Sequence, residues 1–92
     1  MITAIVFVKA DVAKIPEVAE QIAALDGVSE VYSVTGDVDL IAMVRVREHE
    51  RLADVIADQM SKVKGVVSTN TNIAFRAYSE HDLDAAFSLG ID

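Results

Sequence analysis

The residues best suited to hold a charged ligand are a glycine and two aspartates near the middle of the chain. They belong to the run Thr35-Gly36-Asp37-Val38-Asp39, between two apolar stretches, 28–34 and 40–46, that are typical of strands. A carboxylate attracts an ammonium group, and a glycine lets a ligand approach the backbone closely. The same residues also suit an ordinary turn, because glycine supplies a positive φ and aspartate tolerates turn geometry. From the pattern alone, a plain turn and a ligand-binding turn are equally good interpretations.

A second concentration of polar residues lies at 68–72, within a predicted strand that is otherwise apolar. Thr69 and Thr71 share a face with Ile73, so their hydroxyls require hydrogen-bond partners if that face is buried. A ligand's carboxylate or ammonium group could supply them. Threonine is also a common strand residue, and a partly exposed edge strand explains the same pattern.

Catalytic and metal-binding motifs are absent from the sequence. There is no cysteine, which excludes disulfides, thiolate metal ligands and thiol nucleophiles. The two histidines, His49 and His81, fall near predicted helix starts among acidic residues, and neither belongs to a metal-ligand spacing. The sequence therefore predicts no cofactor, no metal and no enzymatic activity.

Size and composition indicate one small acidic domain covering residues 1–92. The chain is 52% hydrophobic but carries a net charge of −7, which opposes nucleic-acid binding through phosphate contacts. The apolar N-terminal stretch is too short for a membrane span and has no basic residue before it. We expect a cytoplasmic protein that contacts neither nucleic acid nor membrane directly.

The predicted elements follow the order strand, helix, strand, strand, helix, strand. Strands are expected at 2–9, 28–35, 39–47 and 66–78, helices at 15–26 and 48–63, and a short final helix at 79–90. The second half repeats the apolar pattern of the first at a constant offset of 38 residues (27 to 65). A repeated strand–helix–strand unit with right-handed crossovers predicts an α+β, ferredoxin-like βαββαβ fold with a four-stranded antiparallel sheet.

The first and third predicted strands are apolar on both faces. Ile5 and Phe7, for example, alternate with the equally apolar Val6 and Val8. Two helices cover only one face of a four-stranded sheet, so the other face must pack against another apolar surface that excludes water. We expect a second copy there, giving a homodimer through the sheet faces, a dimeric α/β-barrel-type assembly.

Three stretches together resemble a known family. Gly27-Val28, the run Val34-Thr35-Gly36-Asp37-Val38-Asp39, and Gly65-Val66 leading into Thr69-x-Thr71-x-Ile73 are similar to the effector-binding domain of the Lrp/AsnC transcription regulators. That domain is also called the regulation of amino-acid metabolism (RAM) domain. The resemblance covers nearly the whole chain and implies the same βαββαβ fold.

The resemblance also implies a function and a set of partners. Family members dimerise through their sheets, and the dimers assemble into rings, often octamers. Amino-acid effectors bind in a cleft between dimers, lined by the Gly-Asp turn and by the second and fourth strands. Carried over by position, the ligand-binding residues are Tyr32, Val34, Gly36, Asp37, Val38, Asp39, Thr69 and Thr71.

The chain departs from the family pattern in two ways. The first predicted strand begins at residue 2, so the usual N-terminal helix-turn-helix is missing and we expect a stand-alone effector domain. Val38 stands where many relatives have an aromatic residue, which leaves the identity of the effector open.

Three functions are compatible with these sequence features. The leading hypothesis is a non-catalytic amino-acid sensor that modulates full-length Lrp/AsnC-type regulators by mixed assembly. The second is a small dimeric monooxygenase or isomerase, an architecture that needs an ionisable group between sheet and helices; no predicted strand has a histidine. The third is a purely structural assembly module, in which Gly36-Asp37 only reverses the chain.

Overall fold

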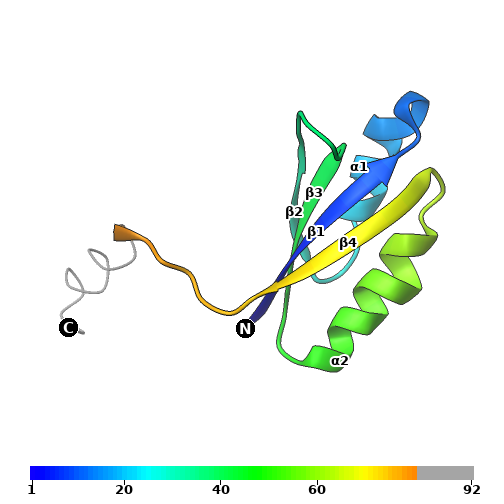
Figure 1. Cartoon of the computed structure of the whole chain (residues 1–92). Coiled ribbons are helices and arrows are strands. Elements are labelled where there is room, and N and C mark those ends of the chain that lie inside the picture. Colours follow the sequence, from blue (N-terminus) through cyan, green and yellow to red (C-terminus); the bar gives the residue numbers. More distant parts are fainter. Residues whose placement is uncertain (81–92) are drawn as a thin grey trace.

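A four-stranded antiparallel sheet forms one layer of the protein and the helices form the other (Figure 1). The computed structural model describes residues 1–80. The strands are β1 (Ile2–Ala10), β2 (Val28–Ser33), β3 (Leu40–Val46) and β4 (Val66–Ala74), in the spatial order β2-β3-β1-β4. This order is the ferredoxin-like arrangement expected for two interleaved strand–helix–strand units. The predicted fold class is confirmed.

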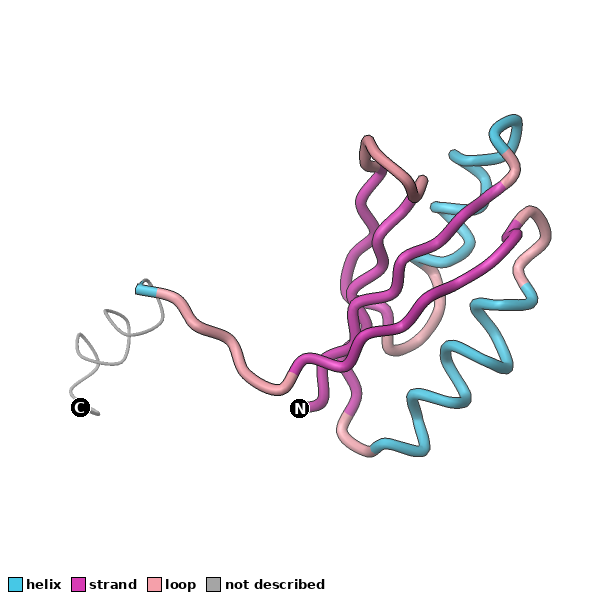
Figure 2. The backbone as a smooth tube through the Cα atoms, in the orientation of Figure 1, coloured by secondary structure: helices cyan, strands magenta, loops and turns pink. Residues whose placement is uncertain are grey.

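Two helical segments make the crossovers on the same face of the sheet (Figure 2). The first is a 3₁₀ turn (Val12–Lys14) followed by α1 (Ile15–Ala23), in which Pro16 occupies the first turn, where its missing N–H has no cost. The second begins with α2 (His49–Leu52) and continues through a π-helical stretch (Ala53–Gln59) into a 3₁₀ turn (Met60–Lys62). Both predicted helices are confirmed, and each ends slightly earlier in the sequence than predicted.

The core between the two layers is aliphatic. Alternate residues of β1 and β3 point toward the helices, and each larger one contributes about 1.5–3 kcal/mol when fully buried. The fully buried members are Ala4, Val6, Val8, Val18, Ile22, Leu40, Ala42, Val44, Val55 and Met60. Among the described residues, no polar or charged side chain is buried.

The opposite sheet face has no helix over it. Ile5 and Phe7 of β1 pair with Met43 and Ile41 of β3, and all four side chains are only partly buried. None of them belongs to the set of side chains that pack on the core between sheet and helices. We call these four residues the open-face cluster. A single copy therefore leaves an apolar surface in contact with water.

A bulge in β2 changes which of its residues face the core. Strict alternation along the predicted strand 28–35 would place Val28 on the same face as Glu30 and Tyr32. The register instead pairs Val28 with the buried Val44 and Glu30 with Met43, so that Ser29 is the extra residue. Val28 packs against the core and Glu30 lies on the open face.

The fourth strand is shorter than predicted. It was expected to reach about Tyr78, but it ends at Ala74, which pairs with Thr3 near the start of β1. Residues 75–80 run away from the sheet, and Phe75 is 98% exposed (Figure 1). The predicted final helix lies outside the described residues, apart from its first two positions.

Candidate functional site

The connection 34–39 between β2 and β3 presents an open glycine at one end of the sheet. Gly36 has φ +107°, and a Cβ added there would meet nothing within 4 Å. Asp37 beside it is exposed, and within residues 1–80 no hydrogen bond or ion pair engages its carboxylate. The tip of the turn therefore combines free space beside the backbone with an unpaired negative charge.

Asp39 anchors the turn to the neighbouring strand. Its Oδ2 accepts a hydrogen bond of 2.9 Å from the backbone N–H of Ala10, and its own N–H donates to the carbonyl of Val8 at 3.0 Å. Its carbonyl accepts from the N–H of Val34 at 3.1 Å, which closes the hairpin. The two aspartates thus differ: Asp39 holds the turn in place, whereas the carboxylate of Asp37 is exposed and unpaired.

Removing the Asp39 carboxylate is expected to lower the free energy of unfolding. Asp39→Ala leaves the part-buried N–H of Ala10 without its acceptor, which costs about 1–2 kcal/mol. Asp39→Asn keeps a side-chain carbonyl that can accept the same bond, so its loss should be smaller. Urea unfolding of both variants checks this order, and equal losses would contradict the anchoring role.

The other predicted site residues lie on different faces of the sheet. Tyr32 pairs with Ile41 on the open face and is 51% exposed. Thr69 pairs with Val8 and Thr71 with Val6, so both threonines are on the helix side. The Oγ1 of Thr69 lies 3.5 Å from the Oγ of Ser61. One copy of the chain does not bring these side chains around a common point.

Val34 and Val38, the two remaining predicted positions, flank the tip of the turn. Both are partly buried, whereas Gly36 and Asp37 between them are exposed. Their side chains give the turn an apolar base, above which the polar tip extends into solvent. The predicted turn residues are thus contiguous, and only the strand residues are distributed over two faces.

The sequence did not single out a groove on the open face. It has a volume of about 550 Å³ and is lined by Met1, Thr3, Ile5, Met43, Arg45, Ala74, Phe75, Arg76 and Ala77. Arg45 donates to Oε1 of Glu30 at 2.8 Å, and this hydrogen bond lowers the pKa of the Glu30 carboxyl. Glu30 pairs with Met43, so Arg45 reaches it diagonally from two residues further along β3. The register shift between Val28 and Glu30 leaves no sequence signal that could have located this contact.

The architecture is that of a small ferredoxin-like domain with an exposed turn at one end of the sheet. The family model of the Lrp/AsnC ligand binding domain matches residues 3–84, and the chain belongs to this family. The resemblance stated from the sequence is confirmed. The family consists of transcription regulators and not of enzymes, as the sequence predicted.

Curated relatives are longer than this chain. An uncharacterized HTH-type transcriptional regulator of Pyrococcus horikoshii, PH1916, is 39% identical over 64 residues, which are 70% of this chain and 43% of the relative. The HTH-type transcriptional regulator FL11 of Pyrococcus furiosus is 30% identical over 79 residues, 86% of this chain and 52% of FL11. The chain spans about half the length of these relatives.

Solved structures share the fold. The crystal structure of TTHA0845 from Thermus thermophilus aligns with a TM-score of 0.82 at 44% identity, covering 87% of this chain and 100% of that one. AsnC of E. coli aligns with a TM-score of 0.78 at 22% identity, covering 85% of this chain and 53% of AsnC.

Within residues 1–80, no helix is both long and apolar enough to cross a membrane.

Proposed function

We propose that this chain is an oligomeric effector-binding domain that takes a small amino acid at the turn 34–39. The observation that carries the proposal is the pairing of an unobstructed Gly36 with the unengaged carboxylate of Asp37, on a turn held in place by Asp39. A plain reversal of the chain needs the glycine but not the free charge. An ammonium group beside Asp37 and a carboxylate near the exposed backbone would satisfy an amino acid at both ends.

Family membership and two structural relatives support an amino acid as the ligand. The family model that matches this chain describes a ligand binding domain. The regulator NMB0573 of Neisseria meningitidis was crystallised as an L-Met complex, and Rv3291c of M. tuberculosis was complexed with L-methionine. These two chains are only 15% and 22% identical to this one, so we take L-methionine as the first probe and not as the assigned effector.

The placement of the strand residues favours a cleft that more than one copy completes. Tyr32 projects from the open face, whereas Thr69 and Thr71 project from the helix side. Residues on opposite faces can line a common cleft only if different copies supply them. This requirement fits the expected assembly, in which two copies join through their open faces and the resulting dimers associate into a ring.

The open face supports the dimer part of the proposal. The open-face cluster (Ile5, Phe7, Ile41 and Met43) is apolar and has no cover in one copy. Phe75 beyond β4 is almost fully exposed, and Arg76 and Ala77 after it line the groove over the same face. A stable interface of ordinary size buries about 800 Å² on each partner, which a four-stranded sheet can supply.

We also infer that the domain modulates longer regulators through mixed assembly. The relatives PH1916 and FL11 are HTH-type regulators of about twice the matched length. Copies that share one sheet face can exchange partners, so this domain could take the place of one regulator subunit. Such a role requires a cytoplasmic location, and co-elution of the two chains on a sizing column would test it.

Substitution at the turn tests the ligand site. Asp37→Asn should weaken binding of a responsive amino acid at least about tenfold, because it removes the charge that meets the ammonium group. Isothermal titration calorimetry with L-methionine and then the other common amino acids measures the effect. Asp58→Asn, at another exposed aspartate, is the matched control and should bind normally.

Two results would count against this function. If no amino acid produces heat with an intact oligomer, the ligand claim fails and the chain is better explained as a structural assembly module. If an amino acid binds but Asp37→Asn and Asp58→Asn bind equally well, the ligand lies elsewhere.

A further inference from the structure

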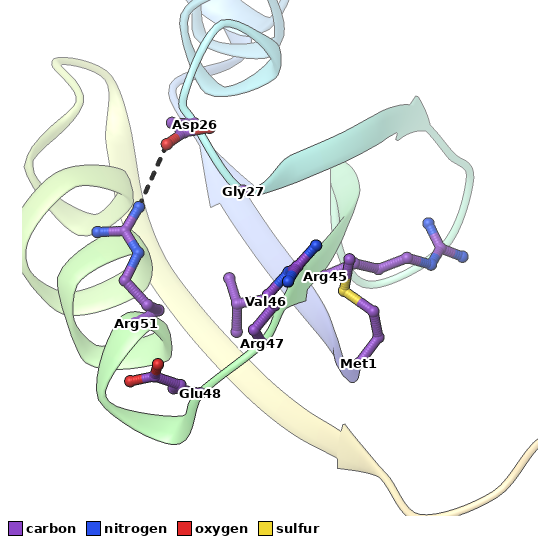
Figure 3. Close-up of a pocket in the computed structure, with 8 residues that line it drawn as sticks. All are labelled: Met1, Asp26, Gly27, Arg45, Val46, Arg47, Glu48 and Arg51. Atoms are coloured by element: carbon purple, nitrogen blue, oxygen red, sulfur yellow. Dashed lines mark hydrogen bonds and ion pairs between the residues drawn. The ribbon is translucent and has the colours of Figure 1, made fainter.

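A second pocket lies at the end of the sheet opposite to the turn 34–39 (Figure 3). It is formed where the loop after α1 meets the connection between β3 and α2. Its volume is about 370 Å³, which is within the range of small-molecule sites. The lining residues are Met1, Asp26, Gly27, Arg45, Val46, Arg47, Glu48 and Arg51.

Two of the three arginines in this pocket already have acidic partners. Arg45 pairs with Glu30 at 2.8 Å. Arg51 pairs with Asp26 and with Asp54, each at 3.4 Å (Figure 3 draws the first of these pairs). These arginines shape the pocket walls, but their charges are largely compensated.

The third arginine and one glutamate are not compensated. Within residues 1–80, no hydrogen bond or ion pair engages the side chain of Arg47 or of Glu48. They are consecutive in the sequence, yet their charged atoms lie more than 4.0 Å apart. Figure 3 shows the Glu48 carboxylate beside α2 and the Arg47 guanidinium on the other side of Val46. The pocket thus holds two free charges of opposite sign with an apolar residue between them.

We propose that this pocket binds a zwitterionic small molecule of the amino-acid class, at a site separate from the turn. The carboxylate of the ligand pairs with Arg47, and its ammonium group pairs with Glu48. Its carbon skeleton lies between the two charges, against Val46 and the backbone of Gly27, which also line the pocket.

Simple ions fit the pocket less well than a zwitterion. An anion would leave Glu48 beside a like charge, and it must approach a chain of net charge −7. A cation would lie beside the like charge of Arg47. A zwitterion has no net charge to be repelled and satisfies both residues together, although both face solvent, so its affinity is expected to be weak.

Backbone amide NMR tests this site separately from the turn. In the ¹H–¹⁵N spectrum of the intact oligomer, Gly27 reports on this pocket and Gly36 on the turn. Titration with L-methionine, the other common amino acids and glycylglycine should shift the Gly27 amide for at least one of them. N-acetylation of that ligand, which removes the ammonium charge, should abolish the shift.

Charge-removing variants give the quantitative part of the test. Arg47→Gln and Glu48→Gln should each raise the ligand's dissociation constant, measured from the Gly27 amide shift, at least about tenfold. Lys64→Gln and Glu50→Gln remove the same charges at exposed positions outside the pocket and should change nothing.

Each other outcome overturns the proposal. The proposal fails if no zwitterion shifts the Gly27 amide, or if the shift survives N-acetylation of the ligand. It also fails if the pocket variants and the control variants bind the ligand with equal dissociation constants. A shift at Gly36 alone would overturn this site and leave the turn as the ligand site. A shift at Gly27 alone would instead support this site and overturn the turn as the ligand site.

Discussion

Gly65→Ala is expected to lower the free energy of unfolding by about 3 kcal/mol. Two costs add at this position. Gly65 has φ +101°, and an L-residue forced into such a conformation costs about 1–3 kcal/mol. A Cβ there would also lie only 2.7 Å from Cγ2 of Val18, a fully buried side chain with a stiff χ1, and overpacking of a core costs about 1–3 kcal/mol.

Gly36→Ala is the matched control for this effect. It has nearly the same backbone conformation, φ +107°, but its Cβ would meet nothing within 4 Å. It should therefore cost about 1–2 kcal/mol from backbone strain alone. Urea unfolding of the two variants isolates the packing contribution as their difference, and equal losses would show that Val18 moves aside freely.

The same argument applies to the other half of the repeat. Gly27, 38 residues before Gly65, has φ +99°, and its Cβ would lie 3.0 Å from Cγ2 of Val55. Gly27 follows α1 but packs against the second helical segment, and Gly65 follows that segment but packs against Val18 of α1. Each glycine lets the chain leave one helical segment and pack closely against the other. The two halves of the repeat are therefore in close contact at both glycines.

Much of this arrangement could be predicted from the sequence, because periodicity and repetition report on burial directly. The alternation of Val6 and Val8 with Ile5 and Phe7 identifies a strand with two apolar faces. The recurrence of Gly27-Val28 as Gly65-Val66 identifies the repeated unit. Together they determine the sheet, the helical face and the open face without any knowledge of side-chain contacts.

The remaining features depend on tertiary contacts that leave no periodic signal. The bulge at Ser29 moves Val28 to the core, although strict alternation places it on the open face. Asp37 and Asp39 are equivalent by residue type, and only the N–H of Ala10 makes Asp39 the anchor. The pocket containing Arg47 and Glu48 forms because loops distant in the sequence meet at one end of the sheet.

Ile5→Glu is expected to dissociate the proposed dimer while leaving the fold of each copy intact. Ile5 lies on the open face, flanked by Met43 on β3 and Asn72 on β4, so in a single copy its side chain meets solvent. In a two-fold symmetric interface, each copy brings the same residue, so two glutamates are buried without partners. An uncompensated buried charge costs about 3–5 kcal/mol, and the dissociation constant should rise about a thousandfold.

Analytical ultracentrifugation with circular dichroism on the same samples checks this expectation. Ile5→Glu should sediment as one folded subunit at concentrations where the unsubstituted chain is assembled. Lys62→Glu, on the exposed 3₁₀ turn of the helical layer, adds the same acid outside the open face and should leave assembly unchanged. If Ile5→Glu stays assembled, the copies join through another surface. The cleft proposed between dimers would then need residues other than Tyr32 on the open face.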